Sequence, residues 1–160
     1  MKTGYYTFTP PASWTRTDER VMTKHEPAWE LPRPKADGAA VALVHRRLSS
    51  RNDGATAEEI RTTIDGWKKR WEGVKISERT QPVPGVPGAE AKVYVVDHVK
   101  EGRAVLAAIV DLSAVDARTH GAYTRVGAGL FELEGPEGRI AGAKVDFDAM
   151  VRSVGLSDDD

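Results

Sequence analysis

Apolar residues follow two different spacings along the chain, which predict strands in most of the sequence and helices in two segments. Alternating apolar and polar residues, or short apolar runs between prolines and glycines, are typical of β-strands. Pro10 and Pro11 end the first such segment because neither can donate a hydrogen bond to a sheet. The pair Asp37-Gly38 favours a hairpin turn. The predicted strands are residues 5–9, 20–31, 39–48, 74–80, 91–99, 103–112 and 121–135.

One predicted strand, residues 103–112, is apolar on both of its faces. Side chains alternate across a strand, so Leu106 and Ile109 belong to opposite faces, and both alternating sets are made of alanine, valine, leucine and isoleucine. A strand of this kind lies inside a sheet that is covered on both sides. We therefore expect helical cover on each face of the sheet.

The first helix is predicted at about residues 57–72, where apolar residues recur every three or four positions. Thr56 and Glu59 match the capping-box pattern at its start. Gly73 stands where helices commonly end. The apolar stripe comprises Ile60, Ile64, Trp67 and Trp71.

Trp67 and Trp71 are two of the chain's four tryptophans, and they could form either a recognition surface or part of the core. Both belong to the only apolar stripe of the predicted helix, so exposing them would leave that helix without a face to pack on the sheet. We therefore expect both indoles to be buried, with their N–H groups reaching polar partners near the edge of the contact.

A second helix is predicted between Pro136, which the first turn of a helix tolerates, and Gly155, which is expected to end it. Glu137 lies near the positive end of the helix dipole, where an acidic side chain is favourable. Its apolar stripe comprises Ile140, Phe147, Val151 and Val154. This helix is the expected second cover of the sheet.

Together these elements predict an α+β fold, in which an antiparallel sheet of about six to seven strands is flanked by helices on both faces as an α/β/α sandwich. A length of 160 residues and a hydrophobic content of 40% suit one domain, which we expect to span residues 1–156. The acidic residues 157–160 are expected to form a disordered tail.

Charge and composition narrow the classes of partner and chemistry. The 23 basic and 24 acidic residues nearly balance and form no long basic stripe, which disfavours nucleic acid as a partner. The chain has no cysteine, which excludes thiol catalysis, disulfides and thiolate metal sites. No segment approaches the roughly 18 apolar residues of a membrane span, so we expect no membrane insertion. A cytoplasmic protein is expected, or alternatively an exported mature form from which a signal peptide has been removed.

Few residues suggest a reactive or binding site. Asp97 and His98 are adjacent on a predicted strand, so they point to opposite faces and cannot act together on one atom. His45 could join His98 only in a metal site that needs a third ligand. Gly127 and Gly129 leave one strand face without side chains, which fits either close packing or a shallow groove for a ligand or peptide. We expect no cofactor and no metal, and His98, Gly127 and Gly129 are the candidate groove residues.

The order of the elements is accompanied by an aromatic and proline-containing start, tryptophans on the first helix, a GPEG turn and the segment FDAMVRSV. These features are Phe8, Pro11, Trp14, Trp67, Trp71 and residues 135–138 and 147–154. In this combination, over residues 5–156, the chain resembles the PsbP-like superfamily, which includes the PsbP subunit of photosystem II, a Ran-binding nuclear import factor and many bacterial proteins. The resemblance implies an antiparallel sheet flanked by helices and supplies no catalytic motif. It also implies protein binding, since members with known roles mostly bind proteins, among them a bacterial branch of adaptor chaperones for type VI secretion effectors.

The leading hypothesis is therefore a non-catalytic protein-binding or assembly module whose partner is another protein. A secretion-effector adaptor chaperone and an exported accessory protein are two forms that such a module takes. The alternative is a small-ligand carrier or an enzyme with a pocket near Asp97, His98 and Gly127. One concave site that contains these three residues would favour the alternative, and a scattered arrangement would favour the binding module. Neither hypothesis specifies an oligomeric state.

Overall fold

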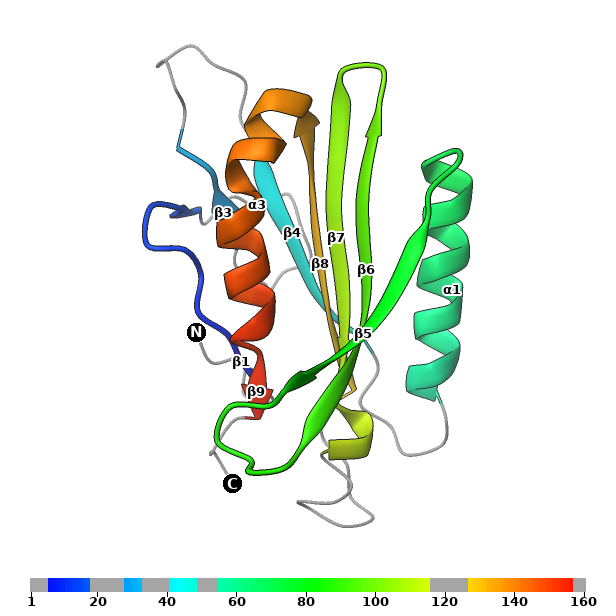
Figure 1. Cartoon of the computed structure of the whole chain (residues 1–160), viewed down its shortest axis with the longest axis vertical. Coiled ribbons are helices and arrows are strands. Elements are labelled where there is room, and N and C mark those ends of the chain that lie inside the picture. The colour runs from blue at the N-terminus through cyan, green and yellow to red at the C-terminus, as the bar shows by residue number, and fades with distance from the viewer. Residues whose placement is uncertain (1–5, 18–27, 33–40, 49–54, 116–126, 157–160) are drawn as a thin grey trace.

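The computed structural model describes residues 6–17, 28–32, 41–48, 55–115 and 127–156 of the chain (Figure 1). The helices are α1 (Ala55–Arg70) and α3 (Glu137–Arg152). The strands are β1 (Tyr6–Thr7), β2 (Thr15–Thr17), β3 (Ala28–Glu30), β4 (Ala42–Leu48), β5 (Ile76–Pro82), β6 (Glu90–Lys100), β7 (Arg103–Asp111), β8 (Ala128–Pro136) and β9 (Gly155–Leu156). The tail at 157–160 lies outside the described residues.

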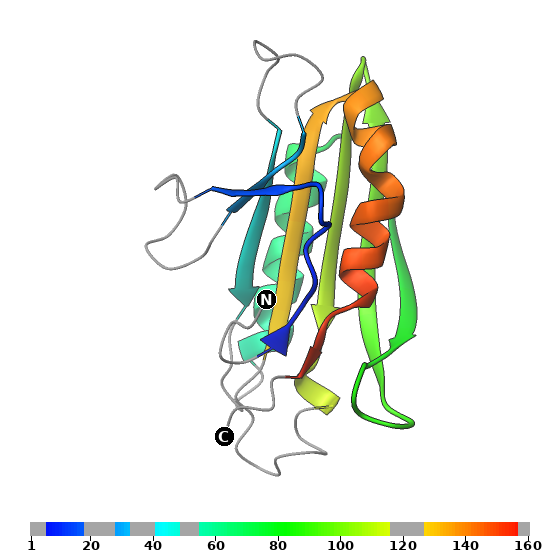
Figure 2. The ribbon, with the colours of Figure 1, turned by 90° about the vertical axis from the view of Figure 1, so that its left-hand side faces the viewer.

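Strands β2 to β8 form one antiparallel sheet of seven strands, in the order β2-β3-β4-β8-β7-β6-β5. Helices α1 and α3 lie on opposite faces of this sheet, as Figures 1 and 2 show from two sides. β1 and β9 form a small second sheet of two strands. The predicted α+β class, an antiparallel sheet with helices on both faces, is confirmed.

Strand β7 is the centre of the fold and is buried on both faces, as its sequence predicts. Ile109 and its alternate neighbours belong to the core beneath α1, whereas Leu106 and its alternate neighbours belong to the core beneath α3. Only Arg103 and Asp111, at the two ends of the strand, are not buried. The sheet therefore separates two hydrophobic cores, and β7 contributes to both.

Helix α1 begins and ends two residues earlier than expected, so Trp71 lies just after it; Ile60, Trp67 and Trp71 of the predicted stripe are buried and Ile64 is partly buried. The helix starts at Ala55, so Thr56 lies inside the first turn and does not precede the helix as a capping-box residue would. The helix starts earlier than predicted because a capping-box pattern does not determine which of the neighbouring residues first adopts helical dihedral angles. Gly73 has a φ angle of +79°, which glycine adopts without strain and which turns the chain towards β5.

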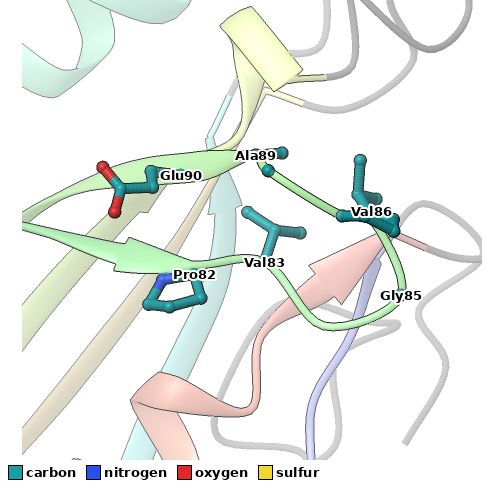
Figure 3. A pocket seen from close by; sticks show the side chains of 8 residues that line it. Pro82, Val83, Gly85, Val86, Ala89 and Glu90 are labelled. Atoms are coloured by element: carbon teal, nitrogen blue, oxygen red, sulfur yellow. The ribbon is translucent and has the colours of Figure 1, made fainter.

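Two hairpins connect the strands on this side of the sheet. The turn between β6 and β7 is formed by Glu101 and Gly102, whose φ angles of 54° and 78° are those of the tight turn that matches strand twist. The proline- and glycine-rich segment 81–88 is the end of β5 and the loop that turns it into β6 (Figure 3). The Asp37-Gly38 hairpin and most of the predicted strand at 20–31 lie outside the described residues.

The N-terminal segment runs beside α3 on the same face of the sheet, which the sequence did not predict (Figure 2). Tyr6 and Phe8 are almost fully buried in the core beneath α3, and Trp14 is buried with them. Thr7 pairs with Gly155, so the expected role of Gly155 as the end of the second helix is wrong. α3 ends three residues earlier, at Arg152, and Gly155 belongs to β9.

Helix α3 begins directly after Pro136, as predicted, and buries Ile140, Phe147 and Val151 against the sheet. The backbone N–H of Glu137 donates a 2.9 Å hydrogen bond to the carbonyl of Gly102, which ties the start of the helix to the β6–β7 turn. Neither helix among the described residues has both the length and the apolar character needed to cross a membrane.

Candidate functional site

The structure places Asp97 and His98 on opposite faces of β6, as strand alternation predicts. His98 lies on the α1 face with Val96, while Asp97 lies on the α3 face and forms an ion pair with Lys144 of α3. In the register with β7, His98 pairs with Val105. The two neighbours therefore belong to different surfaces of the protein.

Gly127 and Gly129 lie at the other end of the sheet from His98. Gly129 pairs with Val110, five positions along β7 from Val105, which corresponds to about 17 Å along the strand. A Cβ atom added at Gly129 would lie 3.2 Å from the ring of Tyr6, so this glycine permits close packing of the N-terminal segment. The carbonyl of Gly127 accepts a hydrogen bond of 3.1 Å from the Leu112 N–H. The structure does not bring His98 and the two glycines into one groove.

His45 also lies apart from His98, beneath the N-terminal segment. Its ring is surrounded by the aromatic rings of Tyr6, Phe8 and Phe131, with centroids 5.7, 4.8 and 5.0 Å away. The Tyr6 hydroxyl hydrogen-bonds to Nε2, and Nδ1 has no partner within the described residues. Burial lowers the pKa of His45 from 6.5 to about 4, so the ring is neutral at physiological pH. This histidine is part of the core.

A groove between α3 and β6 includes one of the predicted residues, Asp97. Its volume is about 490 Å³, within the range of ligand and peptide pockets. Val95, Leu106 and Ala108 form an apolar floor on the sheet, and Phe147 lines it from α3. Leu106 and Ala108 are almost fully buried and Val95 is half-buried, so the groove is a narrow seam along the edge of α3.

Two sets of ion pairs cross this groove from the sheet to α3. Lys144 pairs with Asp97 of β6, and Asp148, one helical turn later, accepts from Arg79 of β5 at 2.9 Å. Arg152 also donates to Asp148, at 2.8 Å. Although burial alone would raise the pKa of Asp148, the hydrogen bonds from Arg152 and Arg79 lower it below its usual value. Asp148 is therefore a carboxylate at neutral pH.

Two exposed valines lie on the same side of the sheet as this groove. Among the residues that the structure describes, Val99 and Val145 are the large apolar side chains that are exposed, by 51% and 82%. Val145 lines the groove from α3, and Val99 follows Asp97 on the α3-facing side of β6. Neither valine is among the predicted site residues, although the position of Val145 outside the buried stripe of its helix is a signal of exposure that the sequence contains.

Other hollows in the described part of the chain offer less chemistry. One of about 750 Å³ is lined by residues of the segment 82–90, in the loop between β5 and β6 shown in Figure 3. A cleft of about 370 Å³ lies between the turn at Trp14 and the first half of α3, where Arg139 donates to the carbonyl of Pro32. The described residues contain no group of three histidine or carboxylate side chains placed to hold a metal ion.

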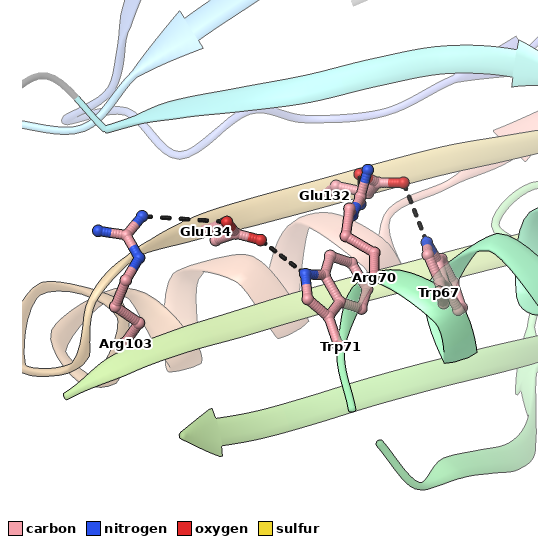
Figure 4. A network of polar contacts seen from close by, with 6 residues as sticks. All are labelled: Trp67, Arg70, Trp71, Arg103, Glu132 and Glu134. Carbon is pink, nitrogen blue, oxygen red and sulfur yellow. Dashed lines mark hydrogen bonds and ion pairs between the residues drawn. The ribbon is translucent and has the colours of Figure 1, made fainter. Parts of the chain in front are cut away.

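The two helix-borne tryptophans are a docking contact between α1 and the sheet and not an exposed surface. Their indole Nε1 atoms donate hydrogen bonds to two carboxylates of β8 (Figure 4). Trp67 donates to Glu132 at 3.0 Å, and Trp71 donates to Glu134 at 2.7 Å. Arg70 pairs with Glu132 and lies over the Trp71 ring, 4.3 Å from its centroid. The prediction that the indole N–H groups find polar partners at the edge of a buried contact is confirmed.

Comparisons with known proteins do not assign this chain to a family. No protein-family model matches the sequence, and no curated protein matches it either. The resemblance to the PsbP-like superfamily therefore stays a prediction.

Proposed function

We propose that this chain is a non-catalytic binding module that takes a segment of another protein into the groove between α3 and β6. The observation that carries the proposal is the position of Val145, which is 82% exposed and lines that groove, while the exposed Val99 lies two residues beyond the groove residue Asp97 on the same side of β6. Exposed apolar side chains that gather beside a concave apolar surface favour a site that a partner covers.

The lining of the groove suits protein recognition. Its floor is apolar, while its rim carries both signs of charge, on Asp97, Lys144, Arg79 and Asp148. An apolar centre with a polar rim is the usual anatomy of a protein interface, in which the rim contributes to orientation and the centre to affinity. Each rim charge named here is already paired with another, so this arrangement favours positioning a partner over proton transfer.

The resemblance to the PsbP-like superfamily supports the same class of function. A secretion-effector adaptor chaperone and an exported accessory protein are both proteins that hold a segment of another protein, and the groove is compatible with either role. The alternative, a small-ligand carrier or an enzyme, placed its pocket near Asp97, His98 and Gly127. Of these three residues only Asp97 lines the groove, which favours the binding module.

Site-directed crosslinking tests the proposal. The chain has no cysteine, so a Val145→Cys variant can carry a single benzophenone group at the groove, and Lys69→Cys carries it on the exposed side of α1 as the matched control. In extracts of the native host we expect one crosslinked protein from position 145 that is missing from position 69. Excess unlabelled parent protein should compete for it, and an unlabelled Val99→Asp/Val145→Asp variant should not.

The crosslinked protein is then identified by mass spectrometry, purified and titrated against the parent chain. Identical products at positions 145 and 69, or equal competition by the parent and the double variant, would contradict the proposal. A crosslinked product that is a small molecule would support the ligand-carrier alternative instead.

A further inference from the structure

We infer that the open edge of β5 is a second binding surface, which takes up an extended segment of another protein as an added strand of the sheet. The contact would be made by backbone groups in the plane of the sheet. It is separate from the groove between α3 and β6, so the role of the edge does not rest on the proposed function. The edge strand is long and regular, its outer backbone groups are unpaired among the described residues, and its charges disfavour a second copy as the added strand.

Strand β5 is the last strand on one side of the seven-stranded sheet, and among the described residues it pairs only with β6 (Figure 2). It has seven residues, whereas β2 at the opposite edge has three. Its pairing with β6 keeps one register from Ile76 to Pro82, without the bulge that edge strands often use against unwanted pairing. Ser77, Glu78 and Thr80 are exposed. β5 is therefore an open edge that is long enough to receive a partner strand.

The hydrogen bonds of the β5–β6 hairpin determine which residues of β5 face outwards. The Val83 N–H donates a 3.0 Å hydrogen bond to the carbonyl of Ala89, which is its partner when the register of the two strands is continued. Hydrogen-bonded and non-hydrogen-bonded pairs alternate along an antiparallel ladder. The odd-numbered residues of β5 therefore direct their N–H and C=O groups towards β6. Ile76, Glu78 and Thr80 direct theirs outwards, in the plane of the sheet.

These three outward-facing residues each offer one backbone donor and one acceptor, as a neighbouring strand requires. Pro82 has no N–H, so the row of donors ends before it. The side chains of the three residues lie on the α1 face of the sheet, where Ile76 packs on the core beneath α1 and Glu78 pairs with Lys92 at 3.4 Å. An added strand would exchange hydrogen bonds with all three residues and place its own side chains beside theirs.

Charges on β5 disfavour a second copy of this chain as the added strand. Two copies related by a two-fold axis would join their β5 strands antiparallel, with outward-facing residues opposite each other. Every register that engages more than one of Ile76, Glu78 and Thr80 in each copy places like charges opposite each other. The opposed pairs are Glu78 with Glu78, Arg79 with Arg79, or Lys75 with Arg79. Because such pairs are destabilising, the edge favours a strand of different sequence.

The side chains along the edge specify the partner segment. A basic residue opposite Glu78 is attracted to its carboxylate, while Lys92 pairs with Glu78 from β6, one strand spacing farther from the partner. β-Branched residues opposite Ile76 and Thr80 suit a partly buried strand. On the α3 face Arg79 is already ion-paired with α3, so the residue opposite it should be uncharged. The expected partner segment is therefore extended and basic, with a pattern such as Val-Thr-Lys-Thr-Val antiparallel to β5.

N-methylated peptides test the added strand directly. The unmodified probe contains Val-Thr-Lys-Thr-Val between Ser-Gly ends. A second probe is N-methylated at its lysine, whose N–H would donate to β5, and a third at its second threonine, whose N–H would point away from β5. A fourth probe has glutamate in place of the lysine. Each is titrated into the ¹⁵N-labelled protein and followed by the shifts and hydrogen exchange of the amides of Ile76, Glu78 and Thr80.

We expect the unmodified probe to slow the exchange of these three amides, which exchange fast in the free protein. The amides of Ser77 and Arg79 should exchange slowly with or without the probe, because they are bonded to β6. The threonine-methylated probe should bind like the unmodified one, and the lysine-methylated probe roughly tenfold more weakly or worse. Equal affinity of the two methylated probes, or no shift with the unmodified probe at millimolar concentration, would overturn the inference.

Two variants of the edge test the choice of partner. Glu78→Lys should weaken the unmodified probe about tenfold and favour the glutamate probe, whereas Glu58→Lys, an exposed charge reversal on α1, should change neither. Unchanged affinities in Glu78→Lys would contradict the charge pattern. Thr80→Pro removes an outward N–H and leaves the ladder to β6 intact, so it should abolish the exchange protection. A dimer of the parent protein that Thr80→Pro dissociates would show that a second copy occupies the edge and would overturn the choice of partner.

The edge and the groove can be distinguished in the same titration. Val145 lines the groove and is not part of β5, so Val145→Asp should leave the affinity for the unmodified probe unchanged. Loss of binding in this variant would show that the probe occupies the groove and not the edge, which would overturn the inference.

Discussion

The Trp67 indole N–H donates a 3.0 Å hydrogen bond to a carboxylate oxygen of Glu132, from the C-terminal end of α1 to the strand beneath it. Trp67 is 1% exposed, so this contact combines a large buried apolar surface with a satisfied polar atom. Together with the Trp71–Glu134 contact one turn later, it fixes the position of α1 along β8. The tryptophans thus stabilise the packing of α1 on the sheet.

Replacing Trp67 with alanine should therefore lower the free energy of unfolding by roughly 3–5 kcal/mol, the usual effect of truncating a large buried aromatic residue. Trp67→Phe keeps an aromatic ring and removes the N–H, so its effect should be smaller. Urea unfolding followed by circular dichroism measures both. A Trp67→Ala protein that unfolds like the parent but no longer binds its partner would show that the indole belongs to the functional surface.

Gly129→Ala should destabilise the protein by about 1–3 kcal/mol, as small-to-large changes in packed sites do. The new methyl group would lie 3.2 Å from both the Tyr6 and the Phe131 rings. Gly142→Ala is the matched control, because nothing lies within 4 Å of its added Cβ and the residue is inside α3. Removing a helix-interior glycine there should stabilise the protein by about 0.5–1 kcal/mol. Opposite signs in the two unfolding free energies are the expected result.

Stability should fall as the pH drops from about 6.5 to about 4, because of His45. Its pKa is 6.5 when exposed and about 4 when folded, so over this range the unfolded chain binds a proton that the folded protein does not. The pKa shift corresponds to a contribution of about 3 kcal/mol to the free energy of unfolding. This contribution is fully present above pH 6.5 and is lost as the pH falls towards 4. Urea unfolding across this range compares the parent with His45→Gln, whose unfolding free energy should depend less steeply on pH. Equal slopes for the two proteins would rule out this role.

The pair between Asp97 and Lys144 should contribute little to stability. Both side chains are about half exposed, and surface ion pairs of this kind are typically worth less than about 1 kcal/mol. A double-mutant cycle of Asp97→Asn and Lys144→Met should give a coupling below that value, and it should shrink further in 1 M salt. A coupling of several kcal/mol would mean that the pair is a fixed element of the fold and closes the groove to a partner.

Much of the fold follows from local patterns in the sequence. The apolar sets of β7 predicted cover on both faces because only a strand between two cores needs apolar side chains on each side. Trp67 and Trp71 were placed correctly because the helix has one apolar stripe. The N-terminal segment was not placed, since the pairing of Thr7 with Gly155 joins the two ends of the chain and has no local signature.

The candidate site was less predictable. His98 and Gly129 were assigned to one candidate groove because of their residue types. The distance between them depends on the register of β6, β7 and β8, which the sequence does not specify. The exposure of Val145 could be predicted without knowing how the strands pair, because a valine outside the buried stripe of a helix already indicates exposure. The pairing of Lys144 with Asp97 depends on how α3 crosses the sheet and could not be foreseen.

The central claim is that the groove beside α3 is a protein-binding surface, and the Val99→Asp/Val145→Asp variant tests it most directly. Both valines are exposed, so the unfolding free energy of the variant should stay within about 0.5 kcal/mol of the parent. The affinity for the partner protein identified by crosslinking is then measured by calorimetry. We predict at least a tenfold loss of affinity at unchanged stability. Undiminished affinity in a stable double variant would contradict the account.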